Sequence, residues 1–308
     1  MSHKSDRKKT GGSHLVNNTK ASLAVIGGSQ AYDLLLSGCI KGKRLGEINT
    51  PYGRSQPVYF IRDANAEMLF LSRHGEKGYG VTAPFVNYRA NIYALKELGA
   101  KQIVSWSGPG AMNENYKIGE YVLIDDIIDE THGRESTFYK HLGIGFIRQF
   151  PVFCPTLRES ILHTLKFLGI GITGKGVYVC TQGPRLETPA EIRKYKLYGG
   201  DLVGMTLVPE VFLAKELEMC YASICYVTNY AEGIASRPFK AGELFEGLAT
   251  DSDREAVRSA VALFPQIIKK IAENSSQQKM TCQCQSLMER YKRRGDIGPD
   301  WHSWVAMP

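Results

Sequence analysis

The sequence lacks the features of several large protein classes. Its apolar runs fall well short of the roughly 20 residues of a membrane-spanning helix. The basic N-terminal stretch is not followed by an apolar segment, as a secretory signal would be. Walker A, G-x-S-x-G and H-E-x-x-H patterns do not occur, and the glycine-rich stretches at residues 27–30 and 108–113 do not complete G-x-G-x-x-G. We therefore expect a cytoplasmic protein with no membrane partner, and we set aside nicotinamide oxidoreductases.

A concentrated basic face is also lacking, although the formal net charge is +7. Residues 1–20 carry five basic and one acidic side chain, and residues 276–308 carry five basic and three acidic ones. The chain between them is close to neutral, whereas a nucleic-acid-binding protein gathers its charge on a folded surface. We interpret residues 1–21 as a flexible arm and residues 276–308 as a C-terminal extension, and we expect no nucleic-acid partner.

The seven cysteines do not form the spacing pattern of a metal site. Cys282 and Cys284 form a lone C-x-C, which is too small for a four-ligand site and has no histidine pair nearby. We expect no metal and two exposed thiols without a role, with a redox or disulfide role as the alternative. The other cysteines lie in apolar runs and are expected to be buried as small hydrophobic side chains: Cys39, Cys154, Cys180, Cys220 and Cys225.

What the sequence does contain is an alternation of apolar runs and helical patterns. Several runs are continuously apolar, as in strands of a sheet covered on both faces: Leu23–Ile26, Val58–Ile61, Met68–Leu71, Gln102–Trp106, Tyr121–Ile124, Val177–Thr181 and Ala222–Thr228, with a short strand near Asp201. Apolar residues at helical spacing lie between them, at Phe85–Leu98, Thr156–Leu168, Val208–Leu217 and Asp253–Ile271. The alternation predicts a single three-layer α/β/α domain over residues 22–275, with a mixed, largely parallel sheet.

Polar residues and glycines follow the predicted strands. In open α/β sheets, ligands bind beyond the carboxyl ends of the strands. Glycines beside hydroxyl groups let backbone N–H groups approach an anion, and arginine offers a planar fork that matches phosphate. The residues of this kind predict a phosphate site: Ser29, Arg73, Ser107 and Thr206.

At these residues the sequence resembles the trimeric purine nucleoside phosphorylases, specifically the 5′-methylthioadenosine phosphorylase branch. The resemblance rests on the segments AVIGGS, SRHG, VNYRANIYALKELGA, GPRLETPAEI, VGMTLVPEVFLAKELEMCYASI and VTNYAEG. They extend from about residue 22 to 235, with weaker similarity to about residue 275. As a set these segments are highly specific.

The resemblance implies phosphorolysis, in which phosphate attacks the anomeric carbon of a purine nucleoside and releases the base. It implies no metal or organic cofactor, with inorganic phosphate as a co-substrate, and a homotrimer or hexamer in which a neighbour closes each site. Phosphate would be held by Ser29, Arg73, His74, Ser107, Gly108 and Thr206. The nucleoside would contact Leu186, Glu187, Met205, Asn229 and Ala231, and the catalytic residues would be Asn229, Glu187 and His74.

The stretch QGPRLETPAE, residues 182–191, departs from the methylthioadenosine enzymes. Those enzymes have a small hydroxyl residue at the position of Glu187 and Asp-x-Asp where this chain has Asn229 and Ala231. A glutamate with an asparagine is similar instead to the 6-oxopurine phosphorylases. An ionised Glu187 accepts the N1 proton of hypoxanthine or guanine, while Asn229 donates to O6 or N7. We therefore predict a 6-oxopurine nucleoside substrate: inosine, guanosine or 5′-methylthioinosine.

Other readings of these residues remain open. Glu187 is alternatively a capping residue of the helix that follows Pro189. Asn229 is alternatively a turn residue, and Met205 is alternatively a core residue. The alternative functions are a methylthioadenosine phosphorylase that releases adenine and a non-catalytic nucleoside-binding relative. The sequence also differs from its relatives at Trp106, where a small hydroxyl residue is usual, and lacks a second histidine after His74. It does not distinguish a 5′-hydroxyl from a 5′-methylthio substrate.

Overall fold

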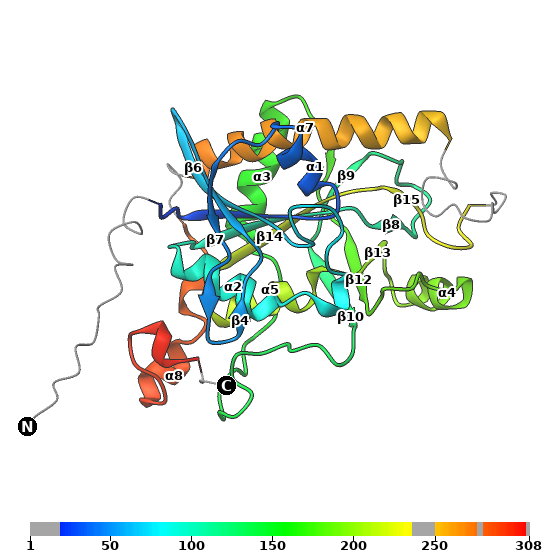
Figure 1. Ribbon diagram of the computed structural model, residues 1–308. Helices are drawn as coiled ribbons and strands as arrows, with labels where there is room; N and C mark the ends of the chain where they lie inside the picture. The colour runs from blue at the N-terminus through cyan, green and yellow to red at the C-terminus, as the bar shows by residue number, and fades with distance from the viewer. Residues whose placement is uncertain (1–18, 236–249, 276–279, 306–308) are drawn as a thin grey trace, which may run out of the picture.

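The computed structural model describes residues 19–235, 250–275 and 280–305 of the chain (Figure 1). One sheet has eight strands, in the spatial order β11 (Ile172–Thr173), β9 (Tyr121–Leu123), β14 (Cys220–Tyr226), β7 (Gln102–Ser107), β1 (Leu23–Gly27), β6 (Ala66–Ser72), β5 (Val58–Asp63) and β2 (Lys43–Gly46). A second sheet has five, in the order β10 (Asp126–Glu130), β12 (Val177–Thr181), β13 (Leu202–Gly204), β8 (Gly110–Ala111) and β15 (Asn229–Tyr230). Strands β3 (Asn49–Thr50) and β4 (Gly53–Arg54) form a hairpin.

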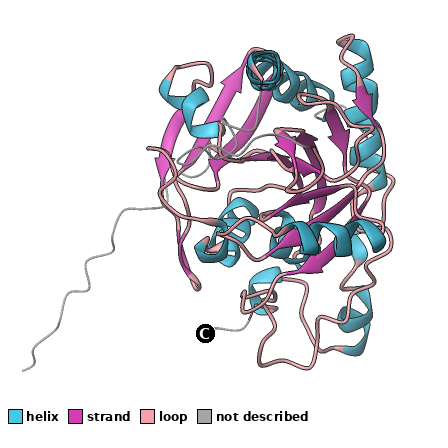
Figure 2. Cartoon of the chain, turned by 90° about the vertical axis from the view of Figure 1, so that its right-hand side faces the viewer, coloured by secondary structure: helices cyan, strands magenta, loops and turns pink. Residues whose placement is uncertain are grey.

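The helices cover both faces of the large sheet, as Figures 1 and 2 show. The described helices are α1 (Ala31–Leu36), α2 (Tyr88–Glu97), α3 (Pro155–Phe167), α4 (Pro189–Leu197), α5 (Leu207–Glu216), α7 (Asp251–Ser275) and α8 (Glu289–Arg294). Short 3-10 turns lie at Ala83–Phe85, Cys284–Ser286 and Trp301–Ser303. Within the described ranges, no helix is both long enough and apolar enough to cross a membrane.

Side-chain alternation along the strands produces the three layers. In β1, Leu23 and Val25 join the core that includes residues of α1, α3 and α7, while Ala24 and Ile26 join the core that includes residues of α2 and α5. Because successive side chains of a strand point to opposite faces, a wholly apolar strand supplies both cores. This confirms the predicted three-layer α/β/α class with its mixed sheet.

The predicted strands and helices all occur, with ends that shift by a few residues. The helix expected from Phe85 begins at Tyr88, because Ala83–Phe85 form a separate 3-10 turn, and the helix expected to end at Ile271 continues to Ser275. Large-sheet strands β14, β7, β1 and β6 are parallel neighbours, whereas β9, β5 and β2 pair antiparallel with β14, β6 and β5. The carboxyl ends of β1, β6 and β7 therefore meet at one edge.

The expectation of one sheet edge was too simple, because the strand ends belong to two sheets. The chain leaves the large sheet at the end of β7 and enters the small sheet as β8 after only Gly108 and Pro109. It makes the same transition from β14 to β15 through Val227 and Thr228. The crossings lie side by side, since the Thr228 N–H donates to the Pro109 carbonyl at 3.1 Å. This junction brings residues of both sheets together.

The described part of the C-terminal extension packs on the body of the domain. Glu218 accepts hydrogen bonds from the Met288 N–H at 2.9 Å and the Lys292 ammonium at 2.6 Å. The Trp301 ring packs against Tyr93 of α2 at 4.9 Å between ring centres, and Trp304 is buried. Residues 288–305 thus pack at the ends of α2 and α5. Residues 1–18, most of the expected N-terminal arm, lie outside the described residues.

Candidate active site

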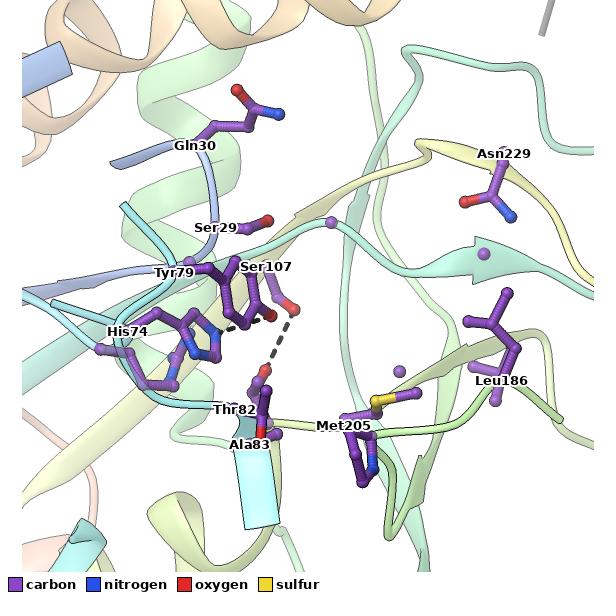
Figure 3. Close-up of a pocket in the computed structure, with 18 of the residues that line it drawn as sticks. Ser29, Gln30, His74, Tyr79, Thr82, Ala83, Ser107, Leu186, Met205 and Asn229 are labelled. Atoms are coloured by element: carbon purple, nitrogen blue, oxygen red, sulfur yellow. Dashed lines mark hydrogen bonds between the residues drawn. The ribbon is translucent and has the colours of Figure 1, made fainter. Parts of the chain in front are cut away.

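A pocket of about 430 Å³ opens at the junction of the two sheets. This volume lies within the usual range for small-molecule sites. Every residue predicted for the site lines it: Ser29, Arg73, His74, Ser107, Gly108, Leu186, Glu187, Met205, Thr206, Asn229 and Ala231. In Figure 3, Ser29, His74 and Ser107 lie together on one side and Leu186 and Asn229 on the other, with Met205 between them. We call these the large-sheet end and the small-sheet end.

Arg73 is the charged group of the large-sheet end, and it is completely buried. Its Nε and Nη2 donate to the two carboxylate oxygens of Glu210, each at 2.7 Å, and Nη2 also donates to Ser105 at 2.9 Å. Burial opposes the charge of Arg73, but Glu210 keeps its pKa above the usual range. Within the described part of the chain, the buried Nη1 has no hydrogen-bond partner. A buried, unsatisfied donor on a cation that lines a pocket is suited to an anionic ligand.

Two hydroxyl groups lie at the same end. The Ser107 and Thr206 hydroxyl oxygens are 3.3 Å apart, although Ser107 ends β7 of the large sheet and Thr206 follows β13 of the small one. Thr206 is the N-cap residue of α5 and its hydroxyl makes no capping hydrogen bond. In this arrangement one hydroxyl donates to the other, and a ligand between the sheets that replaces this bond can accept from both.

Glycine is required where the backbone borders this end of the pocket. A Cβ atom on Gly108 would lie 2.7 Å from the Thr228 methyl group, and one on Gly28 would lie 2.9 Å from the Trp106 carbonyl oxygen. A side chain at Gly108 would push the two crossings apart, and a side chain at Gly28 would push the turn after β1 away from β7. Glycine at these two positions is therefore required by packing within the protein.

His74 is buried and its pKa is lowered to about 4, first by burial and then by the charge of Arg73. At neutral pH the ring is therefore uncharged. Its Nδ1 lies 2.8 Å from the Val81 carbonyl and must donate to it, which leaves Nε2 as an acceptor. Tyr79 stacks on the ring at 4.2 Å between centres, and its hydroxyl lies 3.3 Å from Nε2. Tyr79 thus covers His74 in the loop that lacks the second histidine of the family.

Glu187 at the small-sheet end does not cap a helix. The capping box of α4 is formed by Thr188, whose hydroxyl accepts from the Glu191 N–H at 3.2 Å, and by Glu191, whose carboxylate accepts from the Thr188 N–H at 2.8 Å. This overturns the capping alternative. The Glu187 carboxylate instead accepts from the Thr181 hydroxyl at 2.5 Å at the end of β12, and burial raises its pKa. The hydrogen bond from Thr181 holds one carboxylate oxygen of Glu187 in place, and the side chain lines the pocket.

Asn229 is the first residue of β15 and is buried. Its Oδ1 accepts from the Thr228 hydroxyl at 2.7 Å, and its Nδ2 donates to the Tyr230 carbonyl at 2.9 Å. These bonds fix which atom of the amide is the donor and leave the second N–H of Nδ2 available to the pocket. The register pairs Gly110 of β8 with Asn229 on one side and with Val203 of β13 on the other, so β8 lies between Asn229 and β13. The position is in a strand rather than a free turn.

Met205 and Leu186 supply the apolar surface between the two ends (Figure 3). Gly183 has φ of +63°, and a Cβ atom there would lie 2.4 Å from the Met205 sulfur. The loop that carries Leu186 and Glu187 is therefore packed directly on Met205. Met205 both packs and lines the pocket, as the sequence allowed. Ala231 is nearly buried and belongs to the small apolar cluster under α4.

Sequence reasoning missed Arg134, which holds the small-sheet end together. The guanidinium donates to the carbonyls of Met205 at 2.7 Å, Val208 at 2.5 Å, Thr181 at 3.0 Å and Gln182 at 2.7 Å. It thereby joins the ends of β12 and β13, which carry the pocket loops. No local motif marks this arginine in the sequence, because its partners are backbone carbonyls distant along the chain.

Other lining residues were missed because nothing local marks them either: Gln30, Tyr32, Tyr79, Thr82, Tyr178 and Glu232. Trp106, by contrast, does not line the pocket. Its ring packs on Phe264 of α7 at 4.1 Å and on Tyr226 at 5.3 Å between centres. The departure from the family at Trp106 therefore affects the core between the sheet and α7. Residues 236–249, which follow this part of the pocket in the sequence, lie outside the described residues.

The fold and this pocket together define a nucleoside phosphorylase-like α/β protein. The family model of the phosphorylase superfamily matches residues 22–272, and the chain belongs to this family.

Curated relatives and solved structures extend the likeness over most of the chain. The 6-oxopurine nucleoside phosphorylase of Pyrococcus furiosus is 40% identical over 255 residues, which cover 80% of this chain and 94% of that protein. The S-methyl-5′-thioadenosine phosphorylase of Saccharolobus solfataricus is 38% identical over 274 residues, which cover 88% and 97%. The structure of methylthioadenosine phosphorylase from Schistosoma mansoni in complex with tubercidin is similar with a TM-score of 0.72 and 26% identity, over 85% of this chain and 94% of that one.

The large-sheet end predicts phosphate binding that needs both hydroxyl groups. Inorganic phosphate should raise the melting temperature of the protein, and isothermal titration should give a dissociation constant. Ser107→Ala and Thr206→Val should each weaken phosphate binding about tenfold or more, because each removes a hydrogen bond to a charged ligand. Ser37→Ala, at the exposed C-terminal end of α1, is the matched control and should bind as the wild type does. Unchanged affinity in both pocket variants would contradict the assignment.

Proposed function

We propose that the protein cleaves 6-oxopurine nucleosides by phosphorolysis, with phosphate at the large-sheet end and the base at the small-sheet end. The observation that carries this proposal is that two groups of opposite kind line the two ends of one pocket. Among the described residues, the buried Nη1 of Arg73 has no hydrogen-bond partner, and the Glu187 carboxylate lines the pocket and does not cap helix α4. The products are the free base and ribose 1-phosphate, or its 5-methylthio analogue. The names of the relatives support both the reaction and the preference for oxopurines.

Phosphate serves as nucleophile and as counter-charge. Cleavage of the glycosidic bond builds positive charge on the ribose, which a phosphate anion beneath the sugar stabilises. The free Nη1 of Arg73 donates to phosphate, together with the Ser29, Ser107 and Thr206 hydroxyls and the backbone at Gly108. Glu210 fixes the guanidinium, so that little reorganisation is needed during the reaction. His74, as arranged, offers an acceptor and not a donor, so it suits a ribose hydroxyl better than a phosphate oxygen.

Negative charge develops on the departing purine, and the small-sheet end stabilises it. The remaining N–H of the Asn229 amide donates to N7 or O6, where one such contact is worth roughly 3 kcal/mol in the transition state. The Glu187 carboxylate accepts the N1 proton that hypoxanthine and guanine carry. Adenine has no proton on N1, so that its lone pair would face the carboxylate. A buried group left without its partner rejects the wrong base strongly.

We further propose a cytoplasmic homotrimer that requires no metal or organic cofactor for the reaction. Residues of a neighbouring subunit would complete the 5′ side of the pocket. The resemblance to trimeric relatives supports this assembly. Sedimentation equilibrium of the purified protein would test it directly, with the mass of three chains as the expected result.

The proposed reaction is tested by base release from inosine and from 5′-methylthioadenosine, each with and without phosphate. We expect hypoxanthine release that depends on phosphate and little release of adenine. Adenine release alone would overturn the base preference but keep the reaction. If neither nucleoside is cleaved, guanosine and 5′-methylthioinosine decide the matter, and failure with all four would contradict phosphorolysis.

Glu187→Gln isolates the contact to N1. The amide keeps the size of the side chain but presents a mixed donor and acceptor, so kcat/KM for inosine should fall roughly tenfold to 200-fold, or about 1–3 kcal/mol. Steady-state kinetics give the ratio of kcat/KM for inosine to kcat/KM for 5′-methylthioadenosine. Glu191→Gln, in the first turn of α4 and outside the pocket, is the control and should keep the wild-type ratio of the two kcat/KM values. Equal losses for both substrates in Glu187→Gln would mean that this carboxylate does not select the base.

The pH dependence should report Glu187 rather than His74. Burial raises the pKa of Glu187, so protonation removes the N1 acceptor at a higher pH than for an ordinary glutamate, and kcat/KM for inosine falls as the pH is lowered. His74 has a pKa of about 4, so it is neutral at the pH values above that of an ordinary glutamate where Glu187 becomes protonated. The acid limb should disappear in Glu187→Gln and persist in His74→Gln, while the ionisation of phosphate itself affects all variants alike. A limb lost only in His74→Gln would reverse the assignment.

A further inference from the structure

Four cysteines that are distant in the sequence meet on the side of the domain formed by α3 and α7. The Sγ atoms of Cys154, Cys220, Cys282 and Cys284 all lie within 4.8 Å of one another. Cys154 precedes α3, Cys220 begins β14, and Cys282 and Cys284 belong to the C-terminal extension. The expectation that the two thiols are exposed is therefore wrong, because both are partly buried beside two further sulfurs. The C-x-C motif alone is too small for a metal, but the fold adds two more sulfurs to it.

The arrangement has the size of a tetrathiolate metal site. A zinc ion bound about 2.3 Å from each of four sulfurs holds the sulfurs roughly 3.8 Å apart. The mutual limit of 4.8 Å and the 3.4 Å between the Cys220 and Cys282 sulfurs bracket this value. All four sulfurs lie near one another rather than in two separate pairs. Four soft ligands in tetrahedral reach favour zinc over magnesium or calcium.

The protein around the cluster is arranged for negative charge. Cys154 is the N-cap residue of the 13-residue helix α3, and its sulfur accepts from the Leu157 N–H at 3.4 Å. A helix N-terminus stabilises a thiolate. Backbone N–H groups that donate to ligand sulfurs also orient the ligands of metal sites.

A buried lysine lies close to the cluster. Lys215 is only 3% exposed, and its ammonium group donates to the Pro151 carbonyl at 2.8 Å. Four thiolates and one divalent zinc carry a net charge of −2, which a buried cation partly offsets.

We propose that Cys154, Cys220, Cys282 and Cys284 bind one structural zinc ion. A structural site is the appropriate kind, because all four ligands come from the protein and leave no position for a substrate. None of the four cysteines lines the candidate active site. The ion is thus separate from the catalytic chemistry.

The zinc ion would fix the C-terminal extension to the core. Cys282 and Cys284 lie just before the segment that packs on α2 and α5 through Glu218, Tyr291 and Trp304. Near them, the hydroxyl of Thr281 lies 3.1 Å from that of Thr156 at the start of α3. Cross-linking the extension to α3 and β14 through one ion would hold this segment in place, since binding energy at such a site is also folding energy.

The test is the metal content of the full-length protein, purified with a phosphine reductant and without chelator or a polyhistidine tag. We expect about one zinc per chain by plasma mass spectrometry. Replacement by cobalt should give the ligand-field and thiolate charge-transfer bands of a tetrahedral tetrathiolate site. Removal of zinc by a chelator, with reductant kept present, should lower the melting temperature and speed proteolysis within residues 280–305.

Variants distinguish the cluster from other sites. The double variant Cys282→Ser, Cys284→Ser should lose the zinc and keep phosphate-induced stabilisation. Cys39→Ser should keep both, because Cys39 lies outside the cluster and is exposed, contrary to the expectation that it is buried. Three results with the wild-type chain would overturn the proposal, whether or not the double variant folds. These are four thiols that react freely and bind no added zinc, disulfides among these cysteines that persist in reductant, and iron in place of zinc.

Discussion

The buried ion pair between Arg73 and Glu210 is the constraint on which the candidate site depends. The two side chains are almost wholly inaccessible, and Tyr221 and Ser105 satisfy part of their remaining hydrogen-bonding capacity. Such a pair gains little stability, because the desolvation of both charges offsets their attraction. Loss of one partner, however, costs about 3–5 kcal/mol, because it leaves a buried charge unpaired. What the pair provides is a fixed guanidinium with one donor left for the pocket.

The two sheets divide the proposed chemistry between them. Strands of the large sheet carry Ser29, Arg73 and Ser107, which suit phosphate, whereas the small sheet carries Glu187 and Asn229, which suit the base. The chain passes between the sheets at two adjacent crossings, where close packing requires Gly108. The distance between the ends of the pocket is therefore set by backbone that both sheets share. The anomeric carbon would lie between them, where phosphate beneath the sugar reaches it while the base is held opposite.

The sequence predicted the fold class and the strand-end residues of the pocket because both depend on local patterns, whereas the remaining lining residues came from the resemblance to a known family. A wholly apolar strand such as β1 indicates a sheet that is covered on both faces. Polar residues that follow parallel strands lie together at the carboxyl-terminal edge of the sheet. It did not predict contacts between segments that are far apart in the chain. Arg134 binds backbone carbonyls of two other segments, and Cys154 and Cys220 join Cys282 and Cys284 only after folding. The division into two sheets was missed because β8 and β15 are only two residues long.

The central claim is that one pocket binds phosphate at Arg73 and recognises the N1–H group of the base at Glu187. A crystal structure of the protein with phosphate and hypoxanthine would test it most directly. The account predicts phosphate within hydrogen-bond distance of Arg73 Nη1 and of the Ser107 and Thr206 hydroxyls. It also predicts N1 of hypoxanthine against the Glu187 carboxylate, with Asn229 Nδ2 donating to O6 or N7. Phosphate bound away from Arg73, or a base whose N1 faces solvent while Glu187 contacts only Thr181, would contradict it.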